Sequence, residues 1–102
     1  MKITADICVV PMGVGASVSE HVAEAYQILV EAGLDARLHA HGTNVEGDCD
    51  AVMSAVKRCH ERMHALGVPR VLTTLKIGSR IDKQQTTDDK IEAVQRLAQT
   101  DA

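Results

Sequence analysis

Gly42-Thr43-Asn44-Val45-Glu46-Gly47-Asp48 is the stretch that decides the fold of this 102-residue chain. It joins a glycine that allows a tight turn, a short extended run and an aspartate that can begin a helix. Immediately upstream, apolar and basic side chains alternate over residues 36–41, so residues 36–40 and 43–46 predict the two strands of a hairpin. Glu46 therefore lies within a strand, where its carboxylate requires a cation or a hydrogen-bond donor as a partner.

Working outward from this hairpin, the chain alternates between extended and helical patterns. A capping-box pattern over residues 17–20 indicates the start of one helix, and Asp48 or Asp50 can cap another. Gly33 and Gly67 are the corresponding stop signals. The predicted elements are strands at 3–10, 36–40, 43–46 and 70–78, and helices at 17–33, 48–67 and from Thr86 or Thr87 onward, the last carrying Ile91, Val94 and Leu97.

This order predicts the fold class α+β, a ferredoxin-like βαββαβ sandwich with an additional C-terminal helix. Right-handed β-α-β crossovers on either side of a hairpin produce that arrangement, with strands 3–10 and 43–46 in the middle of the sheet. Helices cover one face of the sheet, and the other face stays open. Because 45% of 102 residues are hydrophobic, we expect a single domain over residues 1–102 with one core.

Composition excludes several classes of function. The net charge of -3 and the presence of a single aromatic residue, Tyr26, argue against a nucleic-acid partner, which requires clustered basic residues and stacking platforms. No apolar run approaches the roughly 20 residues of a membrane helix, so we expect no membrane partner. The chain starts with a strand pattern instead of a signal peptide, which predicts a cytoplasmic protein. Three cysteines without a CxxC spacing predict reduced thiols.

The open face is predicted to carry a mixture of polar and apolar side chains that a second subunit would cover. Strand alternation places there Thr4, Asp6, Cys8, Val10, His39, Asn44, Glu46, Leu72, Thr74 and Lys76. Asp6 and Glu46 then put two carboxylates on one surface, an arrangement that favours a bound cation. The alternative is structural: Asp6 pairs with Lys76, and Glu46 is satisfied by Thr43 or by a neighbouring subunit.

Four motifs in this order resemble the small thiamine-binding protein family over nearly the whole chain. They are Ile3-Thr4-Ala5-Asp6 leading to Pro11-Met12-Gly13, Gly42-Thr43 leading to Glu46-Gly47-Asp48, Lys57-Arg58-Cys59-His60-Glu61, and Arg80-Ile81-Asp82-Lys83. The resemblance implies a ferredoxin-like homodimer or homotetramer that is joined through the open sheet faces and binds thiamine or its pyrimidine part without catalysis. It also implies ligand contacts at Asp6, Thr43 and Glu46, although the family would have a longer glutamate at the position of Asp6.

We therefore predict a non-catalytic protein that binds thiamine or its hydroxymethylpyrimidine moiety at an inter-subunit site on the open face. Its partners would be further copies of itself and this small cationic or pyrimidine ligand, with no other cofactor, no metal and no catalytic residue. The predicted ligand-binding residues are Asp6, Thr43, Asn44, Glu46, Thr74 and Lys76. The carboxylates would supply negative charge to the thiazolium, and the threonines and the amide would orient the ring. The competing interpretation is a structural or regulatory homo-oligomeric module without a ligand.

His60-Glu61-Arg62-Met63-His64 matches the HExxH pattern of zinc metalloproteases and offers a distant third interpretation. A hydrolytic zinc site needs a third protein ligand, and no histidine follows His64. The apolar stripe of this helix runs through Val56, Cys59 and Met63, which leaves the two histidines beside it. We therefore expect ordinary polar helix residues here and no zinc.

Overall fold

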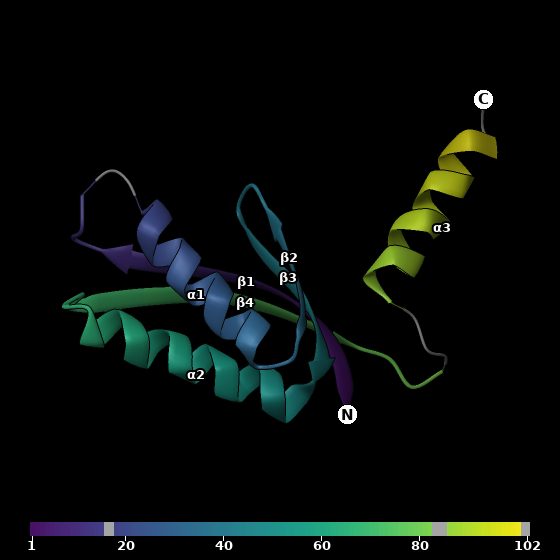
Figure 1. The fold of residues 1–102 in the computed structure, drawn as a ribbon. Coiled ribbons are helices and arrows are strands. Elements are labelled where there is room, and N and C mark those ends of the chain that lie inside the picture. Colours follow the sequence, from purple (N-terminus) through teal and green to yellow (C-terminus); the bar gives the residue numbers. More distant parts are fainter. Residues whose placement is uncertain (16–17, 83–85, 101–102) are drawn as a thin grey trace.

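The computed structural model describes residues 1–15, 18–82 and 86–100, and within them one antiparallel sheet is accompanied by helices (Figure 1). The elements are β1 (Lys2–Met12), α1 (Ser19–Glu31), β2 (Asp35–His39), β3 (Gly42–Asp48), α2 (Cys49–Ala65), β4 (Arg70–Ser79) and α3 (Thr87–Thr100). The strand order is β2-β3-β1-β4, with each neighbouring pair antiparallel. This confirms the predicted ferredoxin-like sandwich, its two central strands and its additional C-terminal helix.

Strand alternation gives the sheet two different faces. In β1, Ile3, Ala5 and Ile7 are buried on the side of α1 and α2. The alternating residues Asp6 and Cys8 point to the other side and are only half-buried. The opposite side is the open face, which carries Thr4, Asp6, Cys8 and Val10 of β1 together with their ladder partners on β3 and β4. The two faces follow from the two-residue period of a strand.

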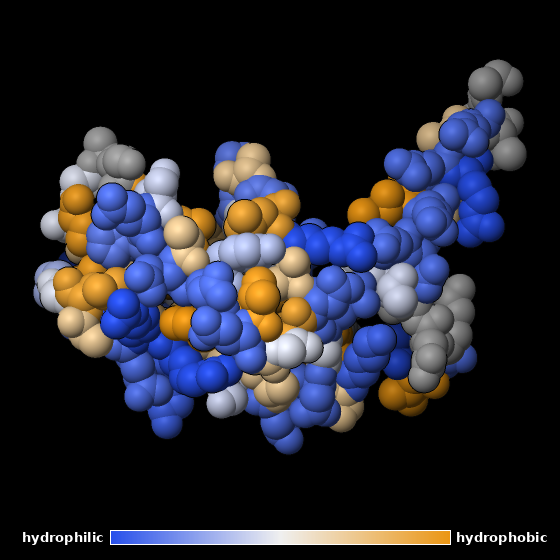
Figure 2. Space-filling model, in the orientation of Figure 1, coloured by the Kyte–Doolittle hydropathy of each residue, from blue (hydrophilic) through white to orange (hydrophobic). Residues whose placement is uncertain are grey.

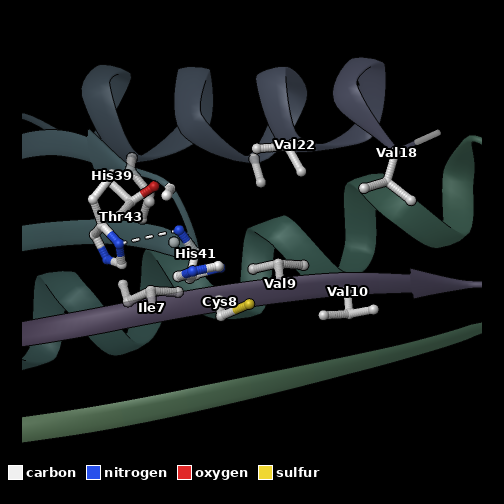
Figure 3. A pocket seen from close by; sticks show the side chains of 13 residues that line it. Ile7, Cys8, Val9, Val10, Val18, Val22, His39, His41 and Thr43 are labelled. Atoms are coloured by element: carbon white, nitrogen blue, oxygen red, sulfur yellow. Dashed lines mark hydrogen bonds between the residues drawn. The ribbon is translucent and has the colours of Figure 1, made fainter.

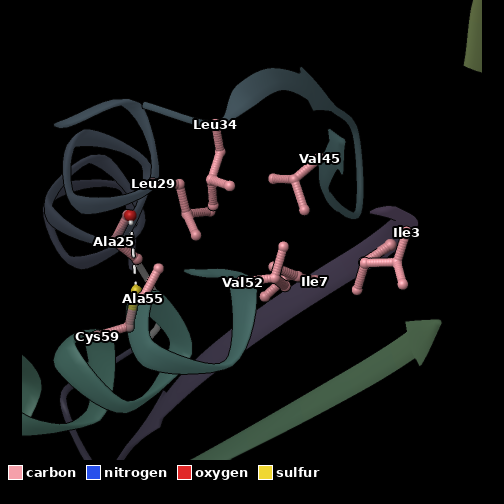
Figure 4. Packing of buried hydrophobic residues seen from close by; sticks show 10 residues of the cluster. Ile3, Ile7, Ala25, Leu29, Leu34, Val45, Val52, Ala55 and Cys59 are labelled. Carbon is pink, nitrogen blue, oxygen red and sulfur yellow. Dashed lines mark hydrogen bonds between the residues drawn. The ribbon is translucent and has the colours of Figure 1, made fainter. Parts of the chain in front are cut away.

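The core lies between the sheet and helices α1 and α2 (Figure 4). Leu29 of α1 packs with Val45 of β3 and with Val52, Ala55 and Cys59 of α2, and all five are essentially inaccessible to solvent. The spacing of the α2 residues at three and four puts them on one side of the helix. Burial of Cys59 and Met63 confirms the apolar stripe predicted for this helix, in which Val56 is partly buried against the core.

The helix starts differ in how well the sequence predicted them. Asp48 caps α2, because one of its carboxylate oxygens accepts the Asp50 N–H at 3.1 Å. For α1, Val18 occupies the N-cap position without a side-chain hydrogen bond, so the helix begins later than the capping-box pattern indicated. Ser17 of that pattern lies outside the described residues. At α3, the Asp89 N–H donates to the Thr86 hydroxyl at 3.0 Å, and the Thr86 N–H donates to Asp89 at 2.9 Å.

Helix α3 projects away from the sandwich (Figure 1). The molecule is consequently elongated, with extents of 50 × 32 × 18 Å and a radius of gyration of 15.5 Å, against about 13 Å for a compact chain of this length. In Figure 2 an open gap separates the far part of α3 from the body, and the visible surface of α3 is mostly hydrophilic with an apolar patch near its base on the side of the gap. The apolar positions predicted for this helix, Ile91, Val94 and Leu97, are all exposed.

Within the described ranges, none of the helices combines the length and the apolar character needed to cross a bilayer.

Candidate functional site

The open face brings several of the predicted ligand-binding residues into register. Asp6 of β1 lies directly opposite Asn44 of β3 on one side and opposite Lys76 of β4 on the other. Thr74 is opposite Cys8, one ladder step further along the same face. This arrangement concentrates a carboxylate, an amide and an ammonium group at the centre of the open face.

Asp6 is bonded to His39 of β2, which lies two strands away. The Asp6 Oδ1 and His39 Nε2 atoms are 2.7 Å apart. The other ring nitrogen, Nδ1, accepts the backbone N–H of His41 at 3.2 Å, so Nε2 carries the hydrogen and donates to the carboxylate. Sequence reasoning placed His39 on this face but gave Lys76 as the alternative, structural partner of Asp6. Among the described residues, Lys76 has no ion-pair partner.

Gly42 makes the bond between Asp6 and His39 possible. A Cβ atom at this position would lie 2.7 Å from the carbonyl oxygen of Ile7, 3.2 Å from Asp6 Oδ1 and 3.3 Å from His39 Nε2. The missing side chain therefore leaves room for the carboxylate and the imidazole to meet over β3. The turn itself is formed by Ala40 and His41, and Gly42 is the first residue of β3.

Glu46 has a different partner from those the sequence suggested. Its carboxylate accepts the backbone N–H of Thr87 at the start of α3. Free N–H groups at a helix N-terminus favour a carboxylate, so Glu46 holds the first turn of α3 against the sheet. Two further contacts fix this turn: Arg37 Nη1 donates to Asp88 at 2.7 Å, and Lys90 Nζ donates to the Thr4 hydroxyl at 3.2 Å.

A shallow groove of about 300 Å³ runs between the open face and the first turn of α3. We call it the open-face groove, and its polar lining consists of Thr4, Asp6, Asn44, Lys76, Thr87 and Lys90. Two lysines and a carboxylate share this lining, and Glu46 adds a second carboxylate at its margin. The groove therefore offers both hydrogen-bond donors and acceptors with nearly balanced charge.

Thr43 lies on the opposite side of the sheet from the other predicted residues. It is only 5% exposed and lines a separate, mainly apolar cavity of about 300 Å³, which we call the helix-side pocket (Figure 3). Val18 and Val22 from the α1 region and Ile7 and Val9 from β1 form much of its wall. Thr43 and Asn44 are consecutive residues of a strand and must point to opposite faces. The six predicted residues therefore do not form one site: five share the open face, and Thr43 does not.

Comparison with known proteins assigns the chain to a family. A family model described as "Thiamine-binding protein" matches residues 5–95. The chain belongs to the thiamine-binding protein family. It is 50% identical over 95 residues to a UPF0045 protein of Synechocystis, covering 93% of this chain and 78% of that one. The family description names a binding function and no reaction.

Solved structures share the fold. A crystal structure of a Methanocaldococcus jannaschii hypothetical protein superposes with a TM-score of 0.85 at 36% identity, covering 91% of this chain and 95% of that one. A putative thiamine biosynthesis/salvage protein from Thermotoga maritima gives a TM-score of 0.79 at 22% identity, covering 92% of this chain and 99% of that one. At that identity the second likeness concerns the fold alone.

The two histidines of the HExxH match take part in ordinary contacts of the fold. His60 Nε2 is 2.6 Å from the hydroxyl of Thr73 on β4, and His64 Nδ1 donates to the carbonyl of Val68 at 2.8 Å. In the part of the chain that the structure describes, no group of three or more His, Cys, Asp or Glu side chains is placed to hold a metal ion. Neither histidine is directed toward the open-face groove, whose lining contains no residue of α2.

Several residues at the groove carried no recognisable signal in the sequence. Thr87 and Lys90 reach it only because α3 begins beside the sheet after β4. Arg37 of β2 contacts this helix start through Asp88. The aspartates and threonines around residue 87 indicated a helix start, but no local pattern states where in space that start lies. Strand alternation placed His39 on the open face, but it could not identify the partner of its side chain.

Proposed function

We propose that this protein binds thiamine, or its aminopyrimidine part, in the open-face groove, at an interface between subunits and without catalysing a reaction. Membership of the thiamine-binding protein family supports the class of ligand. The Thermotoga neighbour, named as a putative thiamine biosynthesis/salvage protein, is consistent with it. The position of the ligand is argued from the groove itself.

The observation that carries this proposal is unused hydrogen-bonding capacity at the centre of the open face. His39 bonds only one oxygen of Asp6, and among the described residues Asp6 Oδ2 and the side chains of Asn44 and Lys76 have no hydrogen-bond partner. All three groups line the same groove. Asp6 and Asn44 are half-buried, whereas Lys76 is exposed. Polar groups that converge on one groove without partners in the protein are typical of a ligand site, and half-buried ones lose free energy when they stay unpaired.

The chemistry of the ligand matches these groups. An aminopyrimidine has an exocyclic amine that can donate to Asp6 and ring nitrogens that can accept from Asn44 or Lys76. The thiazolium of thiamine carries a permanent positive charge, which Asp6 and Glu46 would balance. Thr74 extends the site along β4, whereas Thr43 lies behind the sheet and is not assigned to the groove.

Exposed apolar residues support a site that lies between subunits. Val10 is 39% exposed and Leu72 is 59% exposed, and they face each other across β1 and β4 on the open face, beyond the Cys8–Thr74 pair from the groove. A second copy of the chain would bury them. The same exposure also favours the competing interpretation, a homo-oligomeric module without a ligand, because burial of these residues requires no small molecule.

Titration calorimetry with thiamine, its phosphates and the free pyrimidine separates the two interpretations. We expect wild-type binding, and we expect Asp6→Asn to weaken it by about 1.5–3 kcal/mol, the scale of a charge-assisted hydrogen bond. Glu61→Gln, on the exposed side of α2, is the matched control and should leave affinity unchanged. Absence of wild-type binding would favour the module, and unchanged affinity in Asp6→Asn would place the ligand elsewhere.

Glu46→Gln provides a second readout on the same proposal. Loss of its charge removes both the proposed balance for the thiazolium and the carboxylate that accepts the Thr87 N–H. We therefore expect weaker thiamine binding together with faster hydrogen exchange at the start of α3. Faster exchange with unchanged affinity would restrict Glu46 to a structural role.

A further inference from the structure

A second cavity adjoins the open-face groove, where β1 begins and β4 ends. Its volume is about 640 Å³. The charged side chains in its lining are those of Lys2, Arg80, Asp89 and Lys90, and we call it the basic cavity. Thr4, Gly78 and Lys90 line both the basic cavity and the open-face groove. The two spaces therefore meet at these three residues.

The basic cavity carries positive charge that the described residues leave uncompensated. Within the described ranges, the ammonium groups of Lys2 and Lys90 have no carboxylate partner, and Lys90 donates to the neutral hydroxyl of Thr4 at 3.2 Å. Arg80 is already paired with Asp82, with Nη2 and Oδ2 2.8 Å apart. Two lysines that converge on one cavity without a carboxylate partner favour an anionic occupant.

The carboxylates nearest to these lysines are engaged elsewhere. Asp89 lines the basic cavity, and its carboxylate accepts the Thr86 N–H at 2.9 Å. Asp48 is the ladder partner of Lys2 on β3, and its carboxylate accepts the terminal ammonium group of Met1 at 3.0 Å. Both carboxylates therefore already have a donor, and Lys2 is left to bind another anion.

The groove and the basic cavity follow one another along the open face. Strand β1 presents Asp6, Thr4 and Lys2 there in turn, and the four residues from Asp6 to Lys2 cover about 13 Å of strand. Gly78 lies opposite Thr4 in the ladder. A Cβ atom at Gly78 would lie 3.2 Å from Thr4 Oγ1 and 3.7 Å from Lys90 Nζ. The missing side chain therefore leaves space where the two cavities meet.

We propose that the basic cavity binds the phosphate group of a phosphorylated ligand, so that the protein prefers thiamine monophosphate to thiamine. This inference rests on the proposed function, because it places the pyrimidine in the groove beside Asp6 and the phosphate beside Lys2 and Lys90. An extended thiamine monophosphate has the reach to connect the two. Asp6 lies further from Lys2 than one Debye length, about 8 Å at physiological salt, so its repulsion of the phosphate is largely screened.

Titration calorimetry with thiamine and thiamine monophosphate at matched ionic strength provides the first test. We expect the monophosphate to bind at least about tenfold more tightly, because the lysines add charge-assisted hydrogen bonds. Thiamine binding without a gain from the phosphate would overturn this inference and leave the proposed function intact. Absence of binding by both compounds would remove the proposed function and this inference together.

Lys2→Met tests whether the gain arises in the basic cavity. The substitution removes the ammonium group and keeps an aliphatic stem, so it should weaken monophosphate binding at least about fivefold. Thiamine, which has no phosphate, should be affected little. Lys57→Met, at an exposed position of α2 outside both linings, is the matched control and should keep the full preference. A Lys2→Met variant with the full preference would place the phosphate elsewhere and overturn the inference.

Inorganic phosphate alone distinguishes a phosphate ester from a free anion. We expect inorganic phosphate to bind at least about tenfold more weakly than the monophosphate, because it makes no contact in the groove. Inorganic phosphate that binds as tightly as the monophosphate would show an anion site that is independent of the groove. That result would overturn the assignment of this cavity to a phosphorylated ligand.

Discussion

The two faces of the sheet follow the same strand alternation but differ in how far their apolar side chains are buried. On the covered face, Ile3, Ala5 and Ile7 of β1 are buried by α1 and α2 of the same chain. On the open face, Val10 and Leu72 remain exposed, and polar contacts provide most of the order. The covered face is completed by helices that local sequence patterns predict, whereas the open face keeps apolar side chains that the described part of the chain leaves exposed.

The polar contacts of the open face also differ in kind from the packing of the covered face. The bond from Asp6 to His39 and the bond from Glu46 to Thr87 each connect groups that are distant in sequence, across 33 and 41 residues. Each satisfies one group, whereas core residues contact many neighbours at once. Such contacts orient side chains without contributing much stability, as a ligand site requires.

The largest expected difference between the two faces is in stability. Ile7→Ala should lower the free energy of unfolding by about 2–5 kcal/mol, because it leaves a cavity in the core. Val10→Ala on the same strand is the matched control and should cost less than about 1 kcal/mol in the monomer. Urea denaturation at several protein concentrations measures both.

Concentration dependence sharpens this comparison. If a second copy covers the open face, the loss at Val10 should grow as protein concentration rises and association contributes to stability. The loss at Ile7 should depend much less on concentration. Equal losses at both positions at every concentration would contradict the distinction between the faces.

Substitution of Gly42, the first residue of β3, should cause the next largest loss of stability. Gly42→Ala should cost about 1–3 kcal/mol, because the new Cβ would meet the carbonyl oxygen of Ile7 at 2.7 Å, and backbone must move to relieve it. His39→Ala removes the bond to Asp6 without adding an atom and should cost less than about 1 kcal/mol, since both groups are partly exposed. Thermal and urea unfolding measure both. A Gly42→Ala variant as stable as wild type would show that β3 can shift without cost.

Strand alternation predicted the membership of each face because it depends only on local geometry. The positions of Ile3 to Val10 on the two sides of β1 follow from a two-residue period, and the structure confirms them. The alternative that paired Asp6 with Lys76 does not hold, because the carboxylate bonds His39 instead. No local pattern encodes a bond that passes over Gly42 to a third strand. The partner of Glu46 could not be predicted either, because it depends on the path of the chain between β4 and α3.

Thr43 shows the opposite limitation. The family resemblance suggested it as a ligand residue, whereas alternation alone separates it from Asn44. The structure places Thr43 in the helix-side pocket, behind the proposed groove. A role for Thr43 in binding therefore requires a ligand on the covered side of the sheet.

The smallest expected difference between the two faces is in the reactivity of one cysteine thiol on each side of the sheet. Burial raises the pKa of the Cys59 thiol from 9.0 to about 11, and its Sγ lies 3.6 Å from the carbonyl of Ala25. Cys8 lies on the open face and is partly accessible. A thiol reagent at about pH 8 should therefore modify Cys8 in the native protein and reach Cys59 only on unfolding.

The raised pKa of Cys59 also predicts the sign of a pH effect. Above the unfolded pKa of 9.0 the unfolded chain loses this proton while the folded chain keeps it, so stability should fall as pH rises toward 11. The slope from this group is at most about 1.4 kcal/mol per pH unit. Cys59→Ala should lower stability by an amount that does not depend on pH and should remove this slope. Subtracting its curve of stability against pH from that of the wild type therefore isolates the thiol, because the lysines and Tyr26, which titrate in the same range, are present in both proteins. A difference curve that stays flat from pH 9 to 11 would show that Cys59 keeps an ordinary pKa and that water reaches the covered face as readily as the open one.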